Sequence, residues 1–489
     1  MNKPRFSYSL LWVLSTIYLC GLFACASAAP ANAQSQTTDA QYIQSIREAF
    51  GLIQRRFVDE VSPRDLFEGA MNGMFGVLGD RHSSFLDEHT MSDLSETTEG
   101  NFGGVGLYIS KPNNPPADGS PAYVEVASPI EDTPGWRANI SPGDLIIEVN
   151  GTSTALMTMD EVLGVLRGTV GGKVDLLIRR GKSLEFPVTL TRAVIEVPTV
   201  KSAMIGSTGY LKLLTFTPRT VDRAKEALDA FKAANYTSLI LDLRNNYGGL
   251  LNSAVNICDL FLDGGLVVAT KSRIPSENIT FNAKRGTTVP ADMPVIVLIN
   301  QGSASASEIV AGALKDRGRA YLVGEKSYGK GSVQQVYGLT GSVGFKLTIA
   351  RYYTPSDVNI DKIGIPPDRE VHFPEFTESD SEQLNALIAA KTIPAFVEEH
   401  PNAAPADVNA LTQRLAAQYH LDPVLIARLI RNEQNRTVIA PAYDLDYDVQ
   451  LQEAVNILKN GNYPGLMRTT KTLKQLQDEA VEEGMALAS

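Results

Sequence analysis

Two uninterrupted apolar runs, Ser238 to Leu241 and Val295 to Ile299, constrain the fold of this chain most. Successive side chains of a strand point to opposite faces, so a run without polar alternation predicts a strand that is covered on both faces. Between Ala193 and about Phe373, strands of this kind alternate with helical patterns such as that of residues 221–233. This alternation predicts an α/β core built around a buried sheet.

A strand-dominated unit, residues 101–192, precedes this core. Only one clear helical pattern, at residues 160–166, interrupts it. Asn150-Gly151 predicts a tight turn, because both residues tolerate positive φ, and Ser141-Pro142-Gly143-Asp144 predicts another turn directly before an apolar strand. The predicted strands are residues 105–110, 122–127, 145–149, 174–179 and 184–190.

Helical patterns flank these two units. Residues 34–100 predict a small arm, in which apolar residues recur at three- and four-residue spacing over residues 42–57 and about 65–78. Residues 374–489 are helical as well, and Asp422-Pro423 predicts a helix start. The helices predicted there are residues 375–389, 405–419, 423–433, 446–459 and 471–483.

Residues 1–33 predict export of the chain. Basic residues precede an apolar run from Leu10 to Ala24, and small residues follow it, as in a secretory signal. Ala31-Asn32-Ala33 offers a cleavage site, whereas Leu22-Phe23-Ala24-Cys25 resembles a bacterial lipoprotein acylation site, and an uncleaved run would act as an anchor. All three alternatives take the bulk of the chain out of the cytoplasm, and the expected compartment is a bacterial periplasm.

The charge balance and the metal-binding residue types exclude several function classes. A formal net charge of −11 and a pI of about 5.1 argue against a nucleic-acid partner. None of the five histidines stands in zinc-ligand spacing, so no metal is predicted, and His82 is interpreted as a turn or packing residue. Cys258, which follows the signal, is interpreted as a small core residue.

A serine-rich loop and a glycine-flanked lysine are the candidate catalytic elements. Ser305-Ala306-Ser307-Glu308 matches a capping box, so a serine here has a structural explanation. A helix start after a buried strand also points backbone N–H groups at a developing oxyanion. A lysine depressed in pKa by burial can activate a serine, and Lys330 is the candidate base. The spacing does not choose among Ser303, Ser305 and Ser307.

Lys330 also ends a G-x-x-x-x-G-K pattern that begins at Gly324. A phosphate loop needs Ser or Thr after this lysine and a helix downstream. Residue 331 is glycine, and Val333 to Tyr337 has the pattern of a strand. Nucleotide binding is therefore not predicted.

A third element, Asp242 to Leu251, is a strand end that opens through Gly248 and Gly249 into a helix. Such glycines let a backbone N–H point into the crevice at the carboxyl end of a strand. Arg244 is interpreted as a residue that orders this loop.

The strand-dominated unit resembles a PDZ domain. The matching pieces are Gly103 to Leu107 and Ser141 to Gly151. The resemblance implies a loop whose backbone N–H groups hold a terminal carboxylate, beside a strand edge that pairs with a peptide. A bare glycine-rich turn is the alternative for the first piece. The implied carboxylate-binding residues are Gly104, Val105, Gly106 and Leu107.

With the PDZ-like unit, these segments together resemble the carboxyl-terminal processing peptidases, PDZ-containing serine peptidases of family S41 with a Ser/Lys dyad. The matching segments are residues 242–246, 248–251, 303–316, 324–325, 329–334 and 350–355. The resemblance implies Ser305 as nucleophile, Lys330 as general base and Gln334 as the residue that orients the lysine. It also implies an oxyanion hole from the Ala306 N–H and that of Gly248 or Gly249, with neither metal nor organic cofactor.

The resemblance implies an endopeptidase that captures protein C-terminal tails, and it leaves several points open. A non-catalytic PDZ scaffold on an inactive peptidase fold is the alternative function. Arg167, at the end of the PDZ helix, is a candidate for coupling tail binding to the active site, or an exposed helix-end residue. Tyr247 and Asp357 depart from the family pattern, and residues 375–440 look inserted. The insert predicts a surface for an adaptor or a second copy, or a solvated extension.

Overall fold

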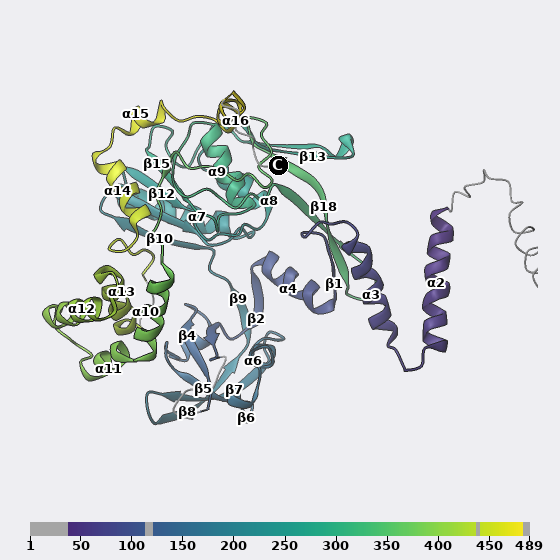
Figure 1. The fold of residues 1–489 in the computed structure, drawn as a ribbon, viewed down its shortest axis with the longest axis horizontal. Coiled ribbons are helices and arrows are strands. Elements are labelled where there is room, and N and C mark those ends of the chain that lie inside the picture. Colours follow the sequence, from purple (N-terminus) through teal and green to yellow (C-terminus); the bar gives the residue numbers. More distant parts are fainter. Residues whose placement is uncertain (1–37, 113–120, 437–440, 483–489) are drawn as a thin grey trace, which may run out of the picture. The chain divides into compact units, whose positions relative to one another are not determined.

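The computed structural model describes residues 38–112, 121–436 and 441–482, so the predicted signal lies outside the described residues (Figure 1). The chain divides into two compact units, one ending at Leu78 and one beginning at Gly79. The first unit consists of α2 (Asp39–Arg56) and α3 (Pro63–Gly76), close to the two helices predicted there. Of the part of the chain that is described, no helix is long and apolar enough to cross a membrane.

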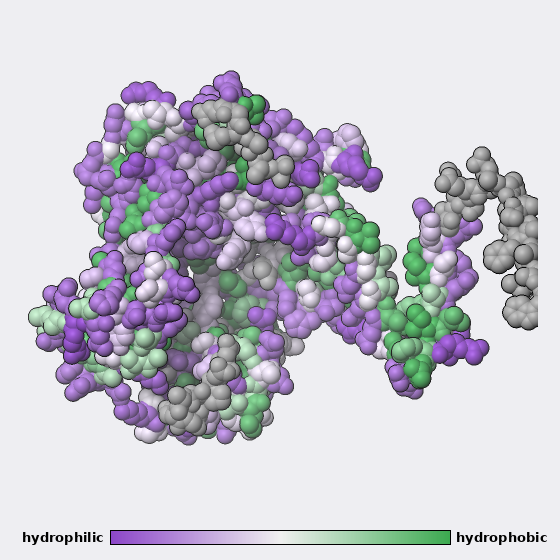
Figure 2. Space-filling view, viewed as in Figure 1, coloured by the Kyte–Doolittle hydropathy of each residue, from purple (hydrophilic) through white to green (hydrophobic). Residues whose placement is uncertain are grey.

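Neither helix of the first unit contains a buried residue. Their apolar side chains gather on the surface instead (Figure 2). Exposed apolar residues of this unit include Tyr42, Ile43, Ile46, Leu52, Ile53, Phe57, Val77 and Leu78. The amphipathic spacing predicted from the sequence is therefore present without a covered face within the unit.

The centre of the second unit is a six-stranded sheet. Its strands are parallel except β10, which pairs with β11 antiparallel. The strands in order across the sheet are β10 (Val200–Ile205), β11 (Thr208–Leu213), β12 (Ser238–Asp242), β15 (Val295–Ile299), β16 (Tyr321–Gly324) and β19 (Arg369–Glu370). All residues of β12 and β15 are buried, which confirms the prediction from the two apolar runs.

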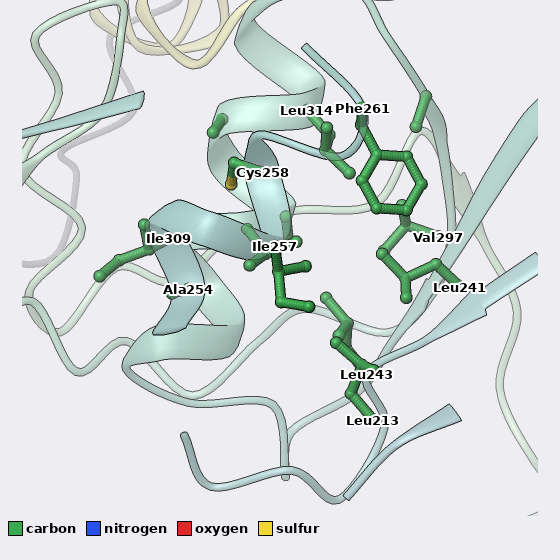
Figure 3. Packing of buried hydrophobic residues seen from close by; sticks show 14 of the residues in the cluster. Leu213, Leu241, Leu243, Ala254, Ile257, Cys258, Phe261, Val297, Ile309 and Leu314 are labelled. Atoms are coloured by element: carbon green, nitrogen blue, oxygen red, sulfur yellow. The ribbon is translucent and has the colours of Figure 1, made fainter. Parts of the chain in front are cut away.

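Successive residues of these strands pack against different helices. Leu239 and Leu241 lie in a core with α7 (Thr220–Ala233), α8 (Leu251–Cys258) and α9 (Ala306–Asp316). Ile240 lies on the opposite face, in a second core with α14 (Val449–Asn460). Figure 3 shows the first core, in which Ile257 and Cys258 of α8 lie near the strands. Cys258 is fully buried, as predicted.

A second sheet carries the lysine loop. It is antiparallel, and β18 is its longest strand. Its strands are β1 (Ser84–Leu86), β13 (Gly265–Ser272), β14 (Ile279–Ala283), β17 (Ser332–Gly338) and β18 (Gly344–Tyr353). Because β17 follows Lys330 directly, the prediction of a strand rather than a phosphate-loop helix is confirmed.

The PDZ-like unit forms its own sheet and core. Its strands are β3 (Leu107–Ser110), β4 (Val124–Pro129), β5 (Leu145–Val149), β6 (Thr152–Ser153), β7 (Lys173–Arg180) and β8 (Leu184–Thr191), with helix α6 (Met159–Leu166). Asn150 and Gly151 have φ of 49° and 78°, which confirms the tight turn. The first strand was predicted from Val105 but begins at Leu107. A ribbon of β2 (Asn101–Gly104) and β9 (Ala193–Glu196) brackets this unit.

The insert is a packed helical unit, because its helices share a core that includes Leu387, Leu415 and Ile426. Its helices are α10 (Glu378–Ala389), α11 (Thr392–Glu399), α12 (Pro405–Tyr419) and α13 (Pro423–Gln434). Short helices escaped the sequence patterns: α4 (Glu88–Glu99), α5 (Pro134–Arg137), α11 and α15 (Tyr463–Met467). They are too short or too polar to show a clear apolar period. The chain's last described helix is α16 (Leu473–Glu482).

Candidate active site

Ser305 lies at the N-terminus of α9 in an unusual backbone conformation, with φ 57° and ψ −114°. A positive φ is uncommon for a residue with a Cβ atom, and residues in sparsely populated regions cost about 1–3 kcal/mol each. Its side chain is nearly buried, at the end of the helix where unpaired N–H groups favour negative charge. Local strain therefore holds this hydroxyl at a site suited to an oxyanion.

Hydrogen bonding separates the three serines that the sequence left equivalent. The Ser303 hydroxyl donates to the Leu243 carbonyl at 2.9 Å, and the Ser307 hydroxyl donates to the Asn246 carbonyl at 2.8 Å. Both serines are fully buried and fasten the loop to its neighbour. Ser305 has no such main-chain acceptor among the described residues, so its hydroxyl does not fasten the loop in this way.

Tyr352, on β18, is the side-chain partner of Ser305. Burial raises the pKa of the Tyr352 phenol above its usual value, and a hydrogen bond with the Ser305 side chain partly offsets this increase. Tyr352 is 6% exposed. In this conformation the serine hydroxyl is therefore held by a neutral phenol, and Tyr352 is a site residue that sequence reasoning missed.

Glu308, one turn into α9, ties the serine loop to the lysine loop. One carboxylate oxygen accepts the N–H groups of Ser305 and Lys330, both at 2.8 Å. The other accepts the Gly329 N–H at 2.7 Å and the Ser327 hydroxyl at 2.6 Å. Burial raises the pKa of Glu308, although these hydrogen bonds favour its carboxylate. The capping glutamate recognised in the sequence thus joins the two catalytic loops.

Lys330 is half-buried between charged neighbours. Burial lowers its pKa below the ordinary value, and the like charge of Lys346 lowers it further, while Glu308 and Asp80 act in the opposite direction. A lowered pKa raises the fraction of neutral amine, the form that can accept a proton. Among the described residues, no hydrogen bond joins the Lys330 ammonium to Ser305.

Gln334, on β17, makes its hydrogen bonds away from the lysine. Its amide nitrogen donates to the Ser332 hydroxyl at 2.9 Å and to the Thr348 hydroxyl at 3.1 Å. No described hydrogen bond joins it to Lys330. The amide oxygen remains available as an acceptor, so the role that the family resemblance implies for Gln334 stays a prediction.

The glycine loop lies directly against the serine. A Cβ atom on Gly248 would come within 2.9 Å of the Ser305 Cβ and 3.0 Å of the Ala306 nitrogen. Gly249 lies against Phe216 instead, where a Cβ would come within 2.2 Å of a carbonyl oxygen. The Gly248 N–H donates to the Asn246 side chain at 2.9 Å in this conformation. Of the two predicted glycines, Gly248 is the one beside the serine.

Comparison with known proteins identifies the family. Family models match residues 207–371 as Peptidase family S41, residues 125–180 as a PDZ domain, and residues 23–90 as the Activating protease CtpB N-terminal domain. The carboxy-terminal-processing protease of Bartonella bacilliformis is 38% identical over 367 residues, which cover 73% of this chain and 82% of that protein. This chain belongs to the carboxy-terminal-processing proteases of peptidase family S41. It is a serine-type endopeptidase with a PDZ domain.

Two further similarities cover comparable lengths of this peptidase. The carboxyl-terminal-processing protease of Synechocystis is 33% identical and covers 70% of this chain and 80% of its own. The solved photosystem II D1 C-terminal processing protease is 30% identical, with a TM-score of 0.40 over 68% of this chain and 93% of that one.

The PDZ domain of this peptidase contains a groove of about 330 Å³ between β3 and α6. Val105, Gly106 and Leu107, three of the four residues implied for the carboxylate-binding loop, line it. Gly104 is absent from the lining and pairs with Ala193 at the end of β2. Leucines of α6 supply much of the opposite wall, so the groove suits an apolar tail.

Arg167 lies at the end of this groove. Its guanidinium lies 3.3 Å from Glu96 and 3.9 Å from Asp93, both on α4, and 4.9 Å from the centre of the Phe102 ring. The side chain at this helix end is therefore partnered by two carboxylates and an aromatic ring. Its contacts join the mouth of the groove to the helix that follows β1.

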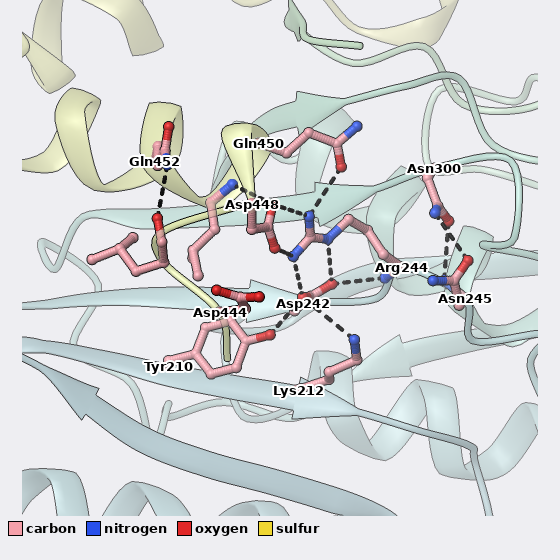
Figure 4. Close-up of polar contacts among 12 residues, drawn as sticks. Tyr210, Lys212, Asp242, Arg244, Asn245, Asn300, Asp444, Asp448, Gln450 and Gln452 are labelled. Carbon is pink, nitrogen blue, oxygen red and sulfur yellow. Dashed lines mark hydrogen bonds and ion pairs between the residues drawn. The ribbon is translucent and has the colours of Figure 1, made fainter. Parts of the chain in front are cut away.

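Arg244, interpreted from the sequence as a residue that orders the glycine loop, is buried at the end of β12 between two carboxylates. Its guanidinium is 5% exposed and lies 2.6 Å from both Asp242 and Asp448, with a further bond of 3.0 Å to Gln450 (Figure 4). Removing one partner of a buried ion pair leaves an uncompensated charge. The segment that resumes after the insert, with Asp448, is thus part of the support for the loop that carries Gly248.

Among the described residues, no group of three or more His, Cys, Asp or Glu side chains could hold a metal ion.

Proposed function

We propose that this chain is an exported endopeptidase that binds the C-terminal tails of proteins in its PDZ groove and cleaves near them through an acyl-enzyme at Ser305. The observation that carries the proposal is the junction at Glu308, which holds the backbones of Ser305 and Lys330 on one carboxylate oxygen. This junction brings a strained serine and a lysine of lowered pKa into one site. Such a pair fits serine activation by an amine.

The reaction proceeds in two halves. Neutral Lys330 accepts the hydroxyl proton of Ser305 as the oxygen bonds to the scissile carbonyl carbon. The N–H of Ala306 and that of Gly248 or Gly249 stabilise the oxyanion. The leaving amine takes the proton from Lys330, and an ester remains on the serine. Water then attacks the ester, Lys330 accepts and returns a second proton, and the serine is restored.

The conformation described above is a resting one under this proposal. The Ser305 hydroxyl must leave Tyr352 and turn to Lys330, and a glycine N–H must turn toward the substrate. Arg167, at the mouth of the tail-binding groove, is the residue assigned to couple tail binding to this rearrangement.

A non-catalytic PDZ scaffold is the alternative, and the missing hydrogen bond between Ser305 and Lys330 favours it. A fluorophosphonate probe, which bonds to an activated serine, separates the two functions. With a peptide ending in an apolar tail present, the wild type is expected to gain one probe mass and Ser305→Ala none. If the wild type binds the peptide tail but its serine is not labelled, and an unfolded tail-bearing protein is not hydrolysed, the scaffold function would be established instead.

Export and partners follow from the terminal regions. Residues 1–33 direct the chain to a bacterial periplasm, with cleavage before Gln34, a lipid on Cys25 or an uncleaved anchor as the forms of the mature N-terminus. The exposed apolar residues of α2 and α3 suit an adaptor or a second copy. Protein tails are the substrates, and nucleic acid is not a partner.

The pH dependence of the reaction should report the environment of Lys330. Its neutral form is the base and its pKa is lowered, so kcat/KM should rise with pH and level off below pH 10.5, the ordinary lysine value. Lys346→Gln removes a charge that lowers this pKa, and should reduce kcat/KM at pH 7 about two- to threefold while leaving the high-pH plateau unchanged. Lys225→Gln, at an exposed position of α7, is the control. A lower midpoint in Lys346→Gln would contradict this assignment.

The junction at Glu308 should matter to both stability and activity. A glutamine at this position replaces one carboxylate oxygen, which accepts hydrogen bonds, by an NH₂ group, which donates them. That NH₂ group would face other donors: two N–H groups on one side, or an N–H and a hydroxyl on the other. Glu308→Gln should lower the free energy of unfolding by about 2–3 kcal/mol and kcat about tenfold. Urea unfolding and peptide hydrolysis measure the two effects, with exposed Glu375→Gln as control. Unchanged values would mean that Glu308 does not hold the loops together.

A further inference from the structure

Asp80 and Ser83 lie just before β1, at one end of a chain of hydrogen bonds that leads to β17 and β18 of the second sheet. The Ser83 hydroxyl donates to the Asp80 carboxylate at 2.5 Å and accepts the backbone N–H of Thr348 at 2.9 Å. Thr348 stands opposite Gln334 in the pairing of β17 with β18, and its hydroxyl accepts from the Gln334 amide. Figure 1 shows β1 beside β18. Ser83 and Thr348 thus connect Asp80 to the amide of Gln334.

The Asp80 carboxylate fixes the direction of the first hydrogen bond in this chain. Burial raises the pKa of Asp80, but hydrogen bonds from the Ser83 and Thr348 side chains and the His82 backbone outweigh it and lower the pKa below its usual value. An ionised carboxylate can only accept, so the Ser83 hydroxyl proton points to Asp80 and the Ser83 oxygen accepts the Thr348 N–H. This bond holds the Thr348 backbone, and the Thr348 hydroxyl oxygen accepts from the Gln334 amide.

These contacts decide which end of the Gln334 amide is left over. The end that faces Thr348 and Ser332 is the NH₂ group, which donates to both hydroxyl oxygens. The amide oxygen is left over and can accept an N–H of Lys330. A neutral lysine that donates one N–H to this oxygen has its lone pair free for the Ser305 proton.

We propose that Asp80 is a positioning residue for the base, acting through Ser83 and Thr348 to hold the Gln334 amide with its oxygen toward Lys330. This role rests on the proposed Ser/Lys mechanism. Asp80 touches neither substrate nor the reacting atoms, so its removal should lower kcat rather than raise KM. His82, interpreted from the sequence as a packing residue, belongs to the same turn through its N–H bond to Asp80.

The charge of Asp80 and its positioning role have opposite effects on the rate near pH 7, so variants can separate the two. The titratable groups around Lys330 are Lys346 of β18, Glu308 of α9, and Asp80 and His82 of this segment, and burial lowers the pKa of His82. Asp80 raises the lysine pKa, so its charge alone would make Asp80→Asn more active near pH 7. A lost orientation would lower the rate at every pH. Thr348→Val breaks the chain without changing any charge, and Thr348→Ser keeps the hydroxyl.

The experiment measures kcat and KM of the full chain against pH for these variants, with thermal melting to verify folding. Asp80→Asn and Thr348→Val are both expected to lower the plateau kcat about 10- to 30-fold with KM unchanged. In Asp80→Asn, the midpoint of the rise of kcat with pH should also move to lower pH, because a negative charge near Lys330 is lost. Thr348→Ser should stay within about threefold of wild type. A folded Thr348→Val with an unchanged plateau, or an Asp80→Asn that only shifts the midpoint, would overturn the proposal. If Lys330→Ala were as active as wild type, the Ser/Lys mechanism itself would fail instead.

Discussion

Lys330→Ala is expected to lower kcat for hydrolysis of a tail-bearing unfolded protein by about 10³-fold or more, because the serine then has no base. Lys330 is half-buried with a lowered pKa, and Glu308 holds its backbone in line with that of Ser305. Among the described residues, no hydrogen bond joins any amine or imidazole to the Ser305 side chain, so no alternative base stands in contact with it. The loss should therefore persist across the pH range in which the protein is folded.

The matched control is Lys326→Ala, in the same loop but with an exposed side chain. It should retain full activity, since it removes the same charge at a distance from the serine. Tail binding by the PDZ groove should be equal in both variants. Wild-type turnover by Lys330→Ala would show that another group activates the serine, and the dyad would have to be abandoned.

The parts of the fold that the sequence predicted are those with a strong apolar period. The two covered strands, β12 and β15, and the helix α12 follow their patterns to within a residue or two. The helix α4 has no buried hydrophobic residue and escaped detection. Such helices are held by tertiary contacts and caps, as when Asp87 accepts the Thr90 N–H, and local pattern does not reveal those contacts.

In the candidate catalytic site as well, some features can be recognised from local sequence and others only from contacts between distant segments. The capping box and the glycine-flanked lysine can be read locally, but the sequence could not choose Ser305 over Ser303. That choice needs the carbonyl of Leu243, sixty residues away, which engages the Ser303 hydroxyl. Tyr352 and Asp80 also reach the site only through the pairing of β18 with its neighbours. The register between strands that are distant in sequence is set by the packing of the whole unit, so no local sequence motif identifies Tyr352 or Asp80 as a site residue.

Gly248→Ala is expected to lower kcat by about 10²–10³-fold, the loss seen when an oxyanion donor is removed. The added Cβ would come within 2.8 Å of the Ala304 oxygen, 2.9 Å of the Ser305 Cβ and 3.0 Å of the Ala306 nitrogen. These atoms belong to a buried loop fastened by Ser303 and Ser307, so they cannot move aside cheaply. The methyl group would therefore displace the serine or the N–H groups that face the oxyanion.

Backbone strain alone must be separated from this contact, because Gly248 has φ 105°. Gly206→Ala provides the separation: Gly206 also has positive φ, at 61°, but a Cβ there meets nothing within 4 Å. An alanine costs about 1–2 kcal/mol of stability at Gly206, whose φ is that of the left-handed helical region, and at least as much at Gly248, whose φ lies outside it. Only Gly248→Ala should lose activity, measured as kcat of protein that unfolds cooperatively. Equal activity in the two variants would mean that the space beside Ser305 is not where the oxyanion forms, and Gly249 would then be the donor to test.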